Sequence, residues 1–559
     1  MDRIWLPRYP AGVPSDVDLA AYRSVCDVFE ESTAKFGQRA AFINQGSTIS
    51  YSEMDRLTRN FAAFLQTELK QTRGARVALM LPNVLQYPVA LFGVLRAGCA
   101  AVNCNPLYTP RELRHQLADS GAEVIVVLEN FAWVVEQVVA STNVKHVVVT
   151  GVGDLLKFPM GLLVNSVVKY AKRLVPKWHL PGAIRMTSAL RSGESRPFER
   201  VPLGASDLAF LQYTGGTTGV PKGAMLTHGN IIANLQQAHA WLRPVLEEGR
   251  ETVVTALPLY HVFAVTANCM LFLKIGASNL LITNPRDIPG FVRELARHRV
   301  TAITGVNTLF NALLANPEFA KLDFTPLRVA VAGGMAVQKA VAEKWKQITR
   351  RALIEGYGLT ETSPFVACNP LDLSEYNGSV GLPFPSTEVA IRDEEDRDVA
   401  IGEVGELCVR GPQVMRGYWN KPAETAKVMT SDGFLRTGDL ATIDQGGFVR
   451  IVDRKKDMII VSGFKVFPNE LEDVLAMCPG VHEAAAFGVP DATSGQAVRV
   501  AVVKKDPALT AQDVIRHCRE HLTAYKVPRL VEFRDELPKS PIGKVLRRVL
   551  SEMSSQAAG

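Results

Sequence analysis

The chain has 559 residues and a net charge of +6, with 47% hydrophobic and 21% charged residues. This length exceeds a single hydrophobic core and the composition is that of a globular protein, so we expect two or more domains and no nucleic-acid partner. The eight cysteines form no CxxC pair and we recognise no signal peptide, which favours reduced thiols in the cytoplasm over disulfides or structural zinc.

Strands and helices alternate in the first part of the chain. The segments "ARVALML", "GCAAVN" and "AEVIVVL" between residues 75 and 128 have strand character, and helices are expected over 84–96 and 110–119. A similar alternation returns over 252–332. This pattern predicts βαβ units, so we expect two α/β subdomains with parallel sheets. Proline, histidine and lysine interrupt the apolar stretch over 253–283, so we expect no membrane-spanning helix.

A basic tract occupies residues 151–200. Its nine Lys or Arg minus three Asp or Glu leave an excess of six, which equals the net charge of the chain. On a helical wheel an apolar stripe lies opposite Lys169, Lys172 and Arg173, and Pro176 ends the helix. Such a helix can lie on an anionic membrane, so residues 157–178 are a candidate for reversible contact with the inner face of the cell membrane. Packing of the stripe on the protein core fits the pattern equally well. The stripe consists of Met160, Leu163, Val164, Val167, Val168, Ala171, Leu174 and Val175.

Short strands with Gly, Pro and Asp turns follow residue 378, among them "TEVAIRD", "GELCVRG" and "GGFVRIVDRK". They predict a small β-rich subdomain over about 379–453. The composition changes at the charged block over 453–457, which indicates a domain boundary; an interdomain hinge fits this block, although a charged turn is the simpler interpretation. We therefore expect an N-terminal domain over 1–453 and a compact, mobile α+β domain over 454–559.

The stretch "YTGGTTGVPKGAMLTH" has the ingredients of a phosphate-binding loop. Its glycines let backbone N–H groups converge, its threonines can donate, and Lys222 adds a positive charge. Gly223 follows this lysine where a Walker A loop has Ser or Thr, so the loop is of another kind.

Four later residues extend a nucleotide site, although each has a simpler structural interpretation. Tyr357, between glycines, can offer a flat ring to a base, and Glu361 can ligate Mg²⁺ unless it is merely solvated. Asp439 can accept from ribose hydroxyls unless it only closes a turn. Lys544 can reach phosphate or carboxylate oxygens unless it is one more exposed lysine near the end of the chain.

In order and spacing these motifs resemble the acyl-adenylate-forming superfamily, and the chain looks most similar to bacterial long-chain fatty-acid CoA ligases. The resemblance extends from "LPNVLQYPVALFGVLRAGCAAVNCNPLYTPREL" to "GKVLRR", and the basic tract resembles the membrane-associated members. It implies an α/β fold: two α/β subdomains and a β-rich subdomain, followed by the small C-terminal domain.

The resemblance also implies the role of each site residue. Glu361, with Thr214, would hold Mg²⁺; His261 would lie beside the substrate carboxylate; Lys222 and Lys544 would stabilise the charge that develops on ATP and the acid. The residues expected to bind ATP or AMP are Thr214, Gly215, Gly216, Thr217, Thr218, Gly219, Lys222, Gly333, Gly334, Tyr357, Gly358, Thr360, Asp439 and Arg454.

Two half-reactions are implied. A fatty acid attacks the α-phosphate of ATP to give an acyl-adenylate and pyrophosphate; rotation of the C-terminal domain about Lys456 then brings Gly463 and Phe464 to a CoA channel, and the CoA thiol displaces AMP. Medium-chain or aryl acids, a carrier protein acting in trans, and a scaffold without catalysis are the alternatives. A homodimer is compatible with the sequence, which determines neither the oligomeric state nor the acyl chain length.

Overall fold

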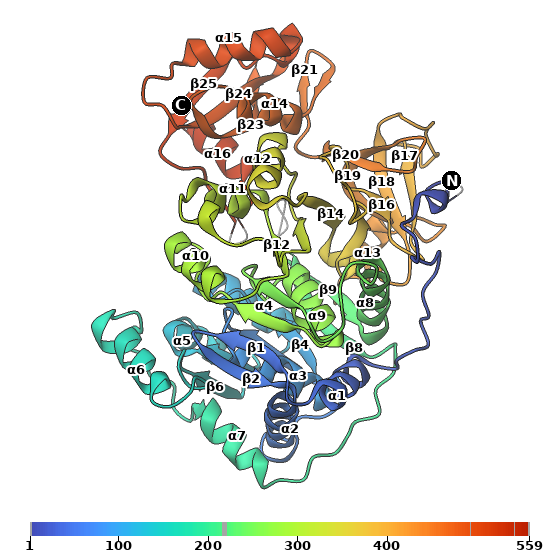
Figure 1. The fold of residues 1–559 in the computed structure, drawn as a ribbon. Coiled ribbons are helices and arrows are strands. Elements are labelled where there is room, and N and C mark those ends of the chain that lie inside the picture. Colours follow the sequence, from blue (N-terminus) through green and yellow to red (C-terminus); the bar gives the residue numbers. More distant parts are fainter. Residues whose placement is uncertain (1–2, 215–220, 492, 541–542, 557–559) are drawn as a thin grey trace.

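The computed structural model describes residues 3–214, 221–491, 493–540 and 543–556. Two mainly parallel sheets form the body of a large N-terminal domain, and a smaller α+β domain lies at its upper end (Figure 1). The first sheet has seven strands, parallel except for the last pair. In spatial order they are β7 (Ile184–Arg185), β6 (His146–Thr150), β5 (Val124–Leu128), β3 (Arg76–Met80), β4 (Ala100–Asn103), β8 (Leu208–Thr214) and β9 (Lys222–Thr227).

The second sheet has nine strands, with a parallel centre and antiparallel pairs at both edges. In spatial order they are β16 (Leu382–Pro383), β15 (Phe365–Cys368), β14 (Ile354–Gly358), β13 (Val329–Ala332), β12 (Ala302–Gly305), β10 (Thr252–Thr255), β11 (Ser278–Leu281), β1 (Ala40–Asn44) and β2 (Ser47–Ser50). The βαβ alternation predicted from the sequence is confirmed in both sheets, because βαβ crossovers keep neighbouring strands parallel.

Helices pack on the two sheets and bury their apolar faces against them. Local signals mark their starts: Thr109 and Glu112 form a capping box at α4, where Pro110 is the first helical residue. The helices of the large domain are α1 (Val25–Phe36), α2 (Tyr51–Thr67), α3 (Gln86–Arg96), α4 (Pro110–Ser120), α5 (Ala132–Glu136), α6 (Met160–Ser166), α7 (Met186–Glu194), α8 (His228–Leu242), α9 (Phe272–Lys274), α10 (Ile288–Arg297), α11 (Asn307–Ala315), α12 (Lys339–Thr349) and α13 (Pro422–Val428).

An antiparallel sheet of four strands forms the β-rich part expected after residue 378. Its order is β17 (Glu388–Arg392), β18 (Gly405–Arg410), β19 (Leu435–Ile443) and β20 (Val449–Arg454). β20 runs one residue past the predicted boundary at 453, and that boundary stays a prediction. The smaller domain has β21 (Ile459–Val461), β22 (Phe464–Val466), β23 (Val481–Asp491), β24 (Gly495–Lys504), β25 (Leu530–Arg534), α14 (Pro468–Ala476), α15 (Ala511–His521) and α16 (Arg547–Gln556).

The helix of the basic tract differs from its sequence prediction. α6 continues as a π-helix over Val167–Ala171 and ends there, before Pro176. Val164 packs against the core, but Met160, Leu163 and Leu174 are 46%, 58% and 55% exposed. The interpretation in which the whole stripe packs on the core is therefore wrong. A helix at the molecular edge has too little protein surface beside it to cover an apolar side of that width.

Two expectations from composition can be checked against the structure. All eight cysteines are free and buried. Within the described residues, the structure has no helix long and apolar enough to cross a bilayer.

Candidate active site

Three polar residues from two sheets meet at the junction of the large domain and its β-rich part. The Tyr357 hydroxyl, near the end of β14, donates to Asp439 Oδ2 at 2.6 Å, and Arg454 Nε lies 3.1 Å from Asp439 Oδ1. The register of β19 and β20 pairs Asp439 with Arg454 directly. Burial and the Asp439 charge raise the pKa of Tyr357 well above its usual value, so the phenol stays protonated and donates. The three residues predicted for the base and ribose are thus adjacent.

Glycines near Tyr357 lie where the protein leaves no space for a side chain. A Cβ on Gly358 would lie 1.9 Å from the Pro364 carbonyl oxygen, and one on Gly333 would lie 3.1 Å from the Phe263 ring. Gly334 has φ +78°, a conformation that favours glycine. Close packing and backbone conformation therefore require glycine at these positions. Thr360 follows in a short 3₁₀ turn over Thr360–Thr362.

Lys222, which the sequence predicts to contact phosphate, begins β9. Its Nζ forms an ion pair with Glu424 of α13 and lies 5.1 Å from the centre of the Tyr418 ring. That pair lowers the pKa of Glu424 to about 2, with Lys427 contributing. The sequence analysis missed Tyr418 and Glu424, because they lie about 200 residues further along the chain. The only signal was the segment "GYWNKPAET", in which aromatic and acidic residues precede a helix.

A cavity of about 450 Å³ opens beside these residues. It is lined by Leu359, Glu361, Glu406, Tyr418, Lys427, Val428, Leu435, Arg436, Thr437, Gly438 and Lys455. The wall carries three cations beside the carboxylates Glu361 and Glu406, and it joins the predicted metal ligand to the turn that precedes Asp439. Each cation has a carboxylate partner: Lys427 pairs with Glu424, Arg436 with Asp396 and Lys455 with Glu406. The loop residues Gly215, Gly216, Thr217, Thr218 and Gly219 lie outside the described residues.

Glu361 fits a role as a Mg²⁺ ligand. Its Oε1 accepts from the Tyr418 hydroxyl at 2.7 Å, and its backbone oxygen accepts from Met415 N. These bonds hold a half-buried carboxylate at the cavity wall, as outer partners do for metal ligands. Thr214 ends β8 opposite Lys222, and β8 packs against the turn that carries Glu361. The carboxylate and the hydroxyl supply the hard oxygen atoms that Mg²⁺ prefers.

His261 lies between β10 and the buried π-helix that begins at Ala264. Burial lowers its pKa to about 4, so the imidazole is neutral near pH 7. Phe263, two residues on, is the ring against which Gly333 packs. The π-helix extends over Ala264–Leu271. The predicted acid-binding residue is thus near the predicted base-binding glycines.

Lys544 reaches the same site from the small domain. Its side chain is half-buried and close enough to Asp439 and Arg454 for both charges to act on it; desolvation is the main cause that lowers its pKa to about 8. A Cβ on Gly543 would lie 2.6 Å from Thr308 Oγ1 of α11, so the lysine loop packs directly on the large domain. The alternative that Lys544 is a solvated lysine is therefore wrong.

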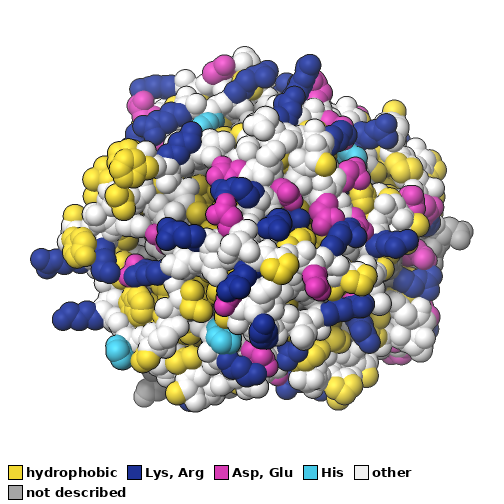
Figure 2. Space-filling view, turned by 90° about the horizontal axis from the view of Figure 1, so that it is seen from below, with side chains coloured by type: hydrophobic (Ala, Val, Ile, Leu, Met, Phe, Trp, Pro, Cys, Tyr) yellow, Lys and Arg dark blue, Asp and Glu magenta, His cyan; other side chains and the backbone are white. Residues whose placement is uncertain are grey.

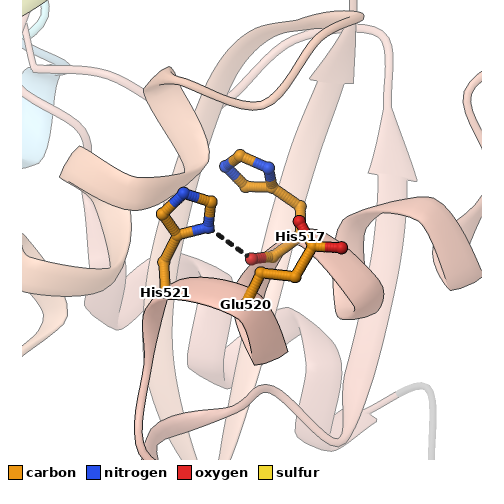
Figure 3. A group of neighbouring side chains, drawn as sticks. All are labelled: His517, Glu520 and His521. Atoms are coloured by element: carbon orange, nitrogen blue, oxygen red, sulfur yellow. Dashed lines mark hydrogen bonds between the residues drawn. The ribbon is translucent and has the colours of Figure 1, made fainter.

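Three predicted residues are not gathered at the site. Lys456 is exposed in the turn after β20. Gly463 and Phe464 lie in the β21–β22 hairpin at the edge of the small domain's sheet, where Phe464 stacks on Tyr525 with ring centres 4.8 Å apart. The small domain also carries a group of side chains that could ligate a metal ion: His517, Glu520 and His521 on α15 (Figure 3). Nε2 of His517 contacts the Val474 carbonyl oxygen, and Nδ1 of His521 contacts the His517 carbonyl oxygen. This group carries no role in the nucleotide site.

Comparisons with known proteins agree with this geometry. Residues 29–419 match the model of the AMP-binding enzyme family, and residues 470–544 match the AMP-binding enzyme C-terminal domain. A long-chain-fatty-acid–CoA ligase of Escherichia coli O157:H7 is 58% identical over 552 residues, covering 99% of this chain and 98% of that protein. The ligase of the same name from Haemophilus influenzae is 53% identical, with the same coverage.

Solved structures share the fold over almost the whole chain. ATP-bound MatB from Rhodopseudomonas palustris has a TM-score of 0.83 and 28% identity, covering 96% of this chain and 100% of that one. A Mycobacterium tuberculosis fatty acyl CoA synthetase has a TM-score of 0.70 and 26% identity, covering 96% and 99%.

Proposed function

The chain belongs to the family of AMP-binding enzymes, and from this premise we propose that it is a long-chain fatty-acid CoA ligase. It joins a fatty acid to CoA at the expense of ATP, through an acyl-adenylate, and releases pyrophosphate and then AMP. Full-length relatives that bear this name are 53–58% identical to the chain. The shared fold and the cavity between Glu361 and the turn before Asp439 support the same activity.

In the first half-reaction the residues of the chain bind, orient and offset charge. Asp439 accepts from the ribose hydroxyls while Arg454 holds its second oxygen, and Tyr357 lies against the base. The substrate carboxylate, beside neutral His261, attacks the α-phosphate, and pyrophosphate leaves with the electron pair of the bond that breaks. Lys544 offsets the charge that develops between the attacking and phosphate oxygens, which needs no nucleophile from the protein. Glu361 and Thr214 would hold Mg²⁺, which would offset the negative charge of the phosphates.

The observation that carries this proposal is the position of Lys544: its loop packs on Thr308 of the large domain, and the half-buried ammonium lies close enough to Asp439 and Arg454 for their charges to act on it. A partly desolvated ammonium is stabilised when an anion binds next to it. The α-phosphate under attack is such an anion. This orientation of the small domain serves adenylation. For the second half-reaction we propose that the domain rotates about Lys456, removes Lys544 and brings Gly463 and Phe464 to the CoA thiol.

ATP–pyrophosphate exchange, measured over carboxylic acids of increasing length with and without CoA, tests the proposal. We expect exchange with long-chain acids in the absence of CoA, and acyl-CoA when CoA is added. Exchange restricted to aryl acids would favour the alternative represented by a feruloyl-CoA synthase of Amycolatopsis, 33% identical over 517 residues, 92% of this chain and 96% of that protein. Adenylate formation without transfer to CoA would favour a carrier protein acting in trans.

We further propose that the segment around α6 contacts the anionic inner face of the cell membrane. Phe158, Leu162 and Tyr170 are 84%, 63% and 72% exposed, together with part of the predicted stripe. Basic and hydrophobic side chains stand side by side at the left of Figure 2, the side on which α6 lies in Figure 1. A long-chain acid partitions into lipid, so such contact would place the enzyme at its substrate. A homodimer stays a prediction.

A further inference from the structure

We propose that Asp453 is a latch that holds the small domain in its adenylation orientation, and that Arg547 and Asn469 are the residues on which it closes. This inference rests on the proposed function, because it assigns a positioning role for Lys544 in the same reaction. It concerns residues that neither touch the proposed substrates nor belong to the predicted site.

Arg547 has several hydrogen-bond and ion-pair partners inside the small domain. It begins α16, three residues after Lys544, and its side chain is 15% exposed. Its Nε and Nη2 donate to both oxygens of Glu472 at 2.9 and 2.7 Å, and Nη2 also donates to Asn469 Oδ1 at 2.6 Å. Both partners lie on α14. Arg547 therefore fastens the lysine loop to α14 inside the small domain.

One contact of this guanidinium crosses the predicted hinge. Arg547 Nη1 lies 3.3 Å from Asp453 Oδ1, and the Asp453 side chain is fully buried. Asp453 Oδ2 also accepts from Asn469 N at 2.8 Å, and Asn469 Nδ2 donates to the Val452 carbonyl at 3.1 Å. Asp453 and Val452 precede Lys456, whereas Asn469 and Arg547 follow it. Rotation about Lys456 must separate these partners.

The remaining bonds of Arg547 do not depend on the rotation. Glu472, Asn469 and Asp457 all follow Lys456 and move with Arg547 as one body. Asp457 Oδ2 lies 3.5 Å from the same Nη1 that contacts Asp453. The guanidinium thus stays paired in both orientations. Asp453 keeps the Arg454 backbone N–H, which donates to its Oδ1 at 2.7 Å, but loses Arg547 and the Asn469 N–H. Loss of two of these three donors to a buried carboxylate is costly, so it opposes rotation away from the adenylation orientation.

The test separates the two half-reactions in the full-length protein. Asp453→Asn keeps the size of the side chain and removes its charge. We expect the rate of ATP–pyrophosphate exchange to fall about tenfold, because the free energy of one hydrogen bond to a charged group corresponds to about that factor. Thioester formation from preformed acyl-adenylate and CoA should be unchanged or faster, because the released orientation is then more populated.

Asp457→Asn is the matched control. It removes the same charge from the same guanidinium, but on the small-domain side of Lys456, so the ratio of the two half-reaction rates should stay at the wild-type value. The double variant Arg547→Met with Asp453→Asn should lose no more exchange activity than Arg547→Met alone. The single variant already lacks the Asp453–Arg547 pair, which is the contact of Arg547 that crosses the hinge. Thermal unfolding of each variant distinguishes loss of the latch from loss of the fold.

An unchanged ratio in Asp453→Asn, or an equal change in Asp457→Asn, would overturn the latch. A wild-type protein that exchanges pyrophosphate with no carboxylic acid would instead overturn the proposed function. The two failures are therefore distinguishable in one set of measurements.

Discussion

The nucleotide site and the α6 segment are both rich in cations, but these cations differ in pairing and in exposure to solvent. At the site Lys222 is paired with Glu424, Arg454 with Asp439, and Lys544 is half-buried. Around α6, Lys172 and Arg173 are exposed, and they have no ion-pair partner within the part of the chain that the structure describes; Lys169 contacts Glu129. Cations that protein contacts hold in fixed, partly buried positions can distinguish one geometry of a polyanion from another. Solvated cations beside apolar side chains bind a diffuse anionic surface and are screened by salt.

The largest effect is expected at the site, for Lys544→Ala. ATP–pyrophosphate exchange should fall by about 10²–10³-fold, because a charge preorganised in a dry site is lost. Thioester formation from preformed acyl-adenylate should be retained. Lys539→Ala is the control, since that lysine lies in the same segment but pairs with Glu483. Equal loss of both half-reactions in Lys544→Ala would contradict its assigned role.

Removal of the Tyr418 hydroxyl tests the proposed metal ligand Glu361 without changing the ligand itself. Tyr418→Phe deletes the donor that holds Glu361 Oε1, and we expect the Mg²⁺ concentration for half-maximal exchange to rise about tenfold. Glu361→Ala should have a larger effect of the same kind. Tyr376→Phe is the matched control, because it removes a hydroxyl that donates to the Val337 carbonyl instead. An unaltered Mg²⁺ dependence in both Glu361→Ala and Tyr418→Phe would remove this carboxylate from the metal site.

The pH dependence of exchange tests the charge of Lys544. Its pKa of about 8 means that the ammonium is present below that pH and lost above it. Exchange should therefore fall about tenfold for each pH unit above 8, the slope for loss of one proton. Buried Glu355 also has a pKa of about 8, so the profile must be repeated with Glu355→Gln. If the alkaline fall disappears in that variant, Glu355 is the titrating group.

The smallest effect is expected at α6. Arg173→Gln should weaken binding to vesicles that contain anionic lipid about fivefold at low salt, because one basic residue near such a surface contributes about 1 kcal/mol. Exchange activity in detergent-free solution should not change. Lys321→Gln, an exposed lysine paired with Glu318, is the control of equal charge. Vesicle binding that is the same in both variants and insensitive to salt would contradict the role of α6.

Part of the site could be predicted from the pattern of residues close together in the sequence. The strand and helix periods predicted both α/β sheets, and the loop ending at Lys222 indicated phosphate, because these features depend on residues close together in the sequence. Tyr418 and Glu424 were not accessible, since their importance comes only from contact with Glu361 and Lys222 across about 60 and 200 residues. The extent of the apolar side of α6 was predicted from its period, but its exposure was not.

The sequence by itself determined the family, the order of the motifs and the chemistry that those residue types support. Only the tertiary structure decided that Lys544 is half-buried near Asp439, and that Asp453 contacts Arg547 across the hinge. The reason is physical: periodicity and turn chemistry are local, whereas burial, pKa and the pairing of buried charges depend on which distant elements the fold brings together.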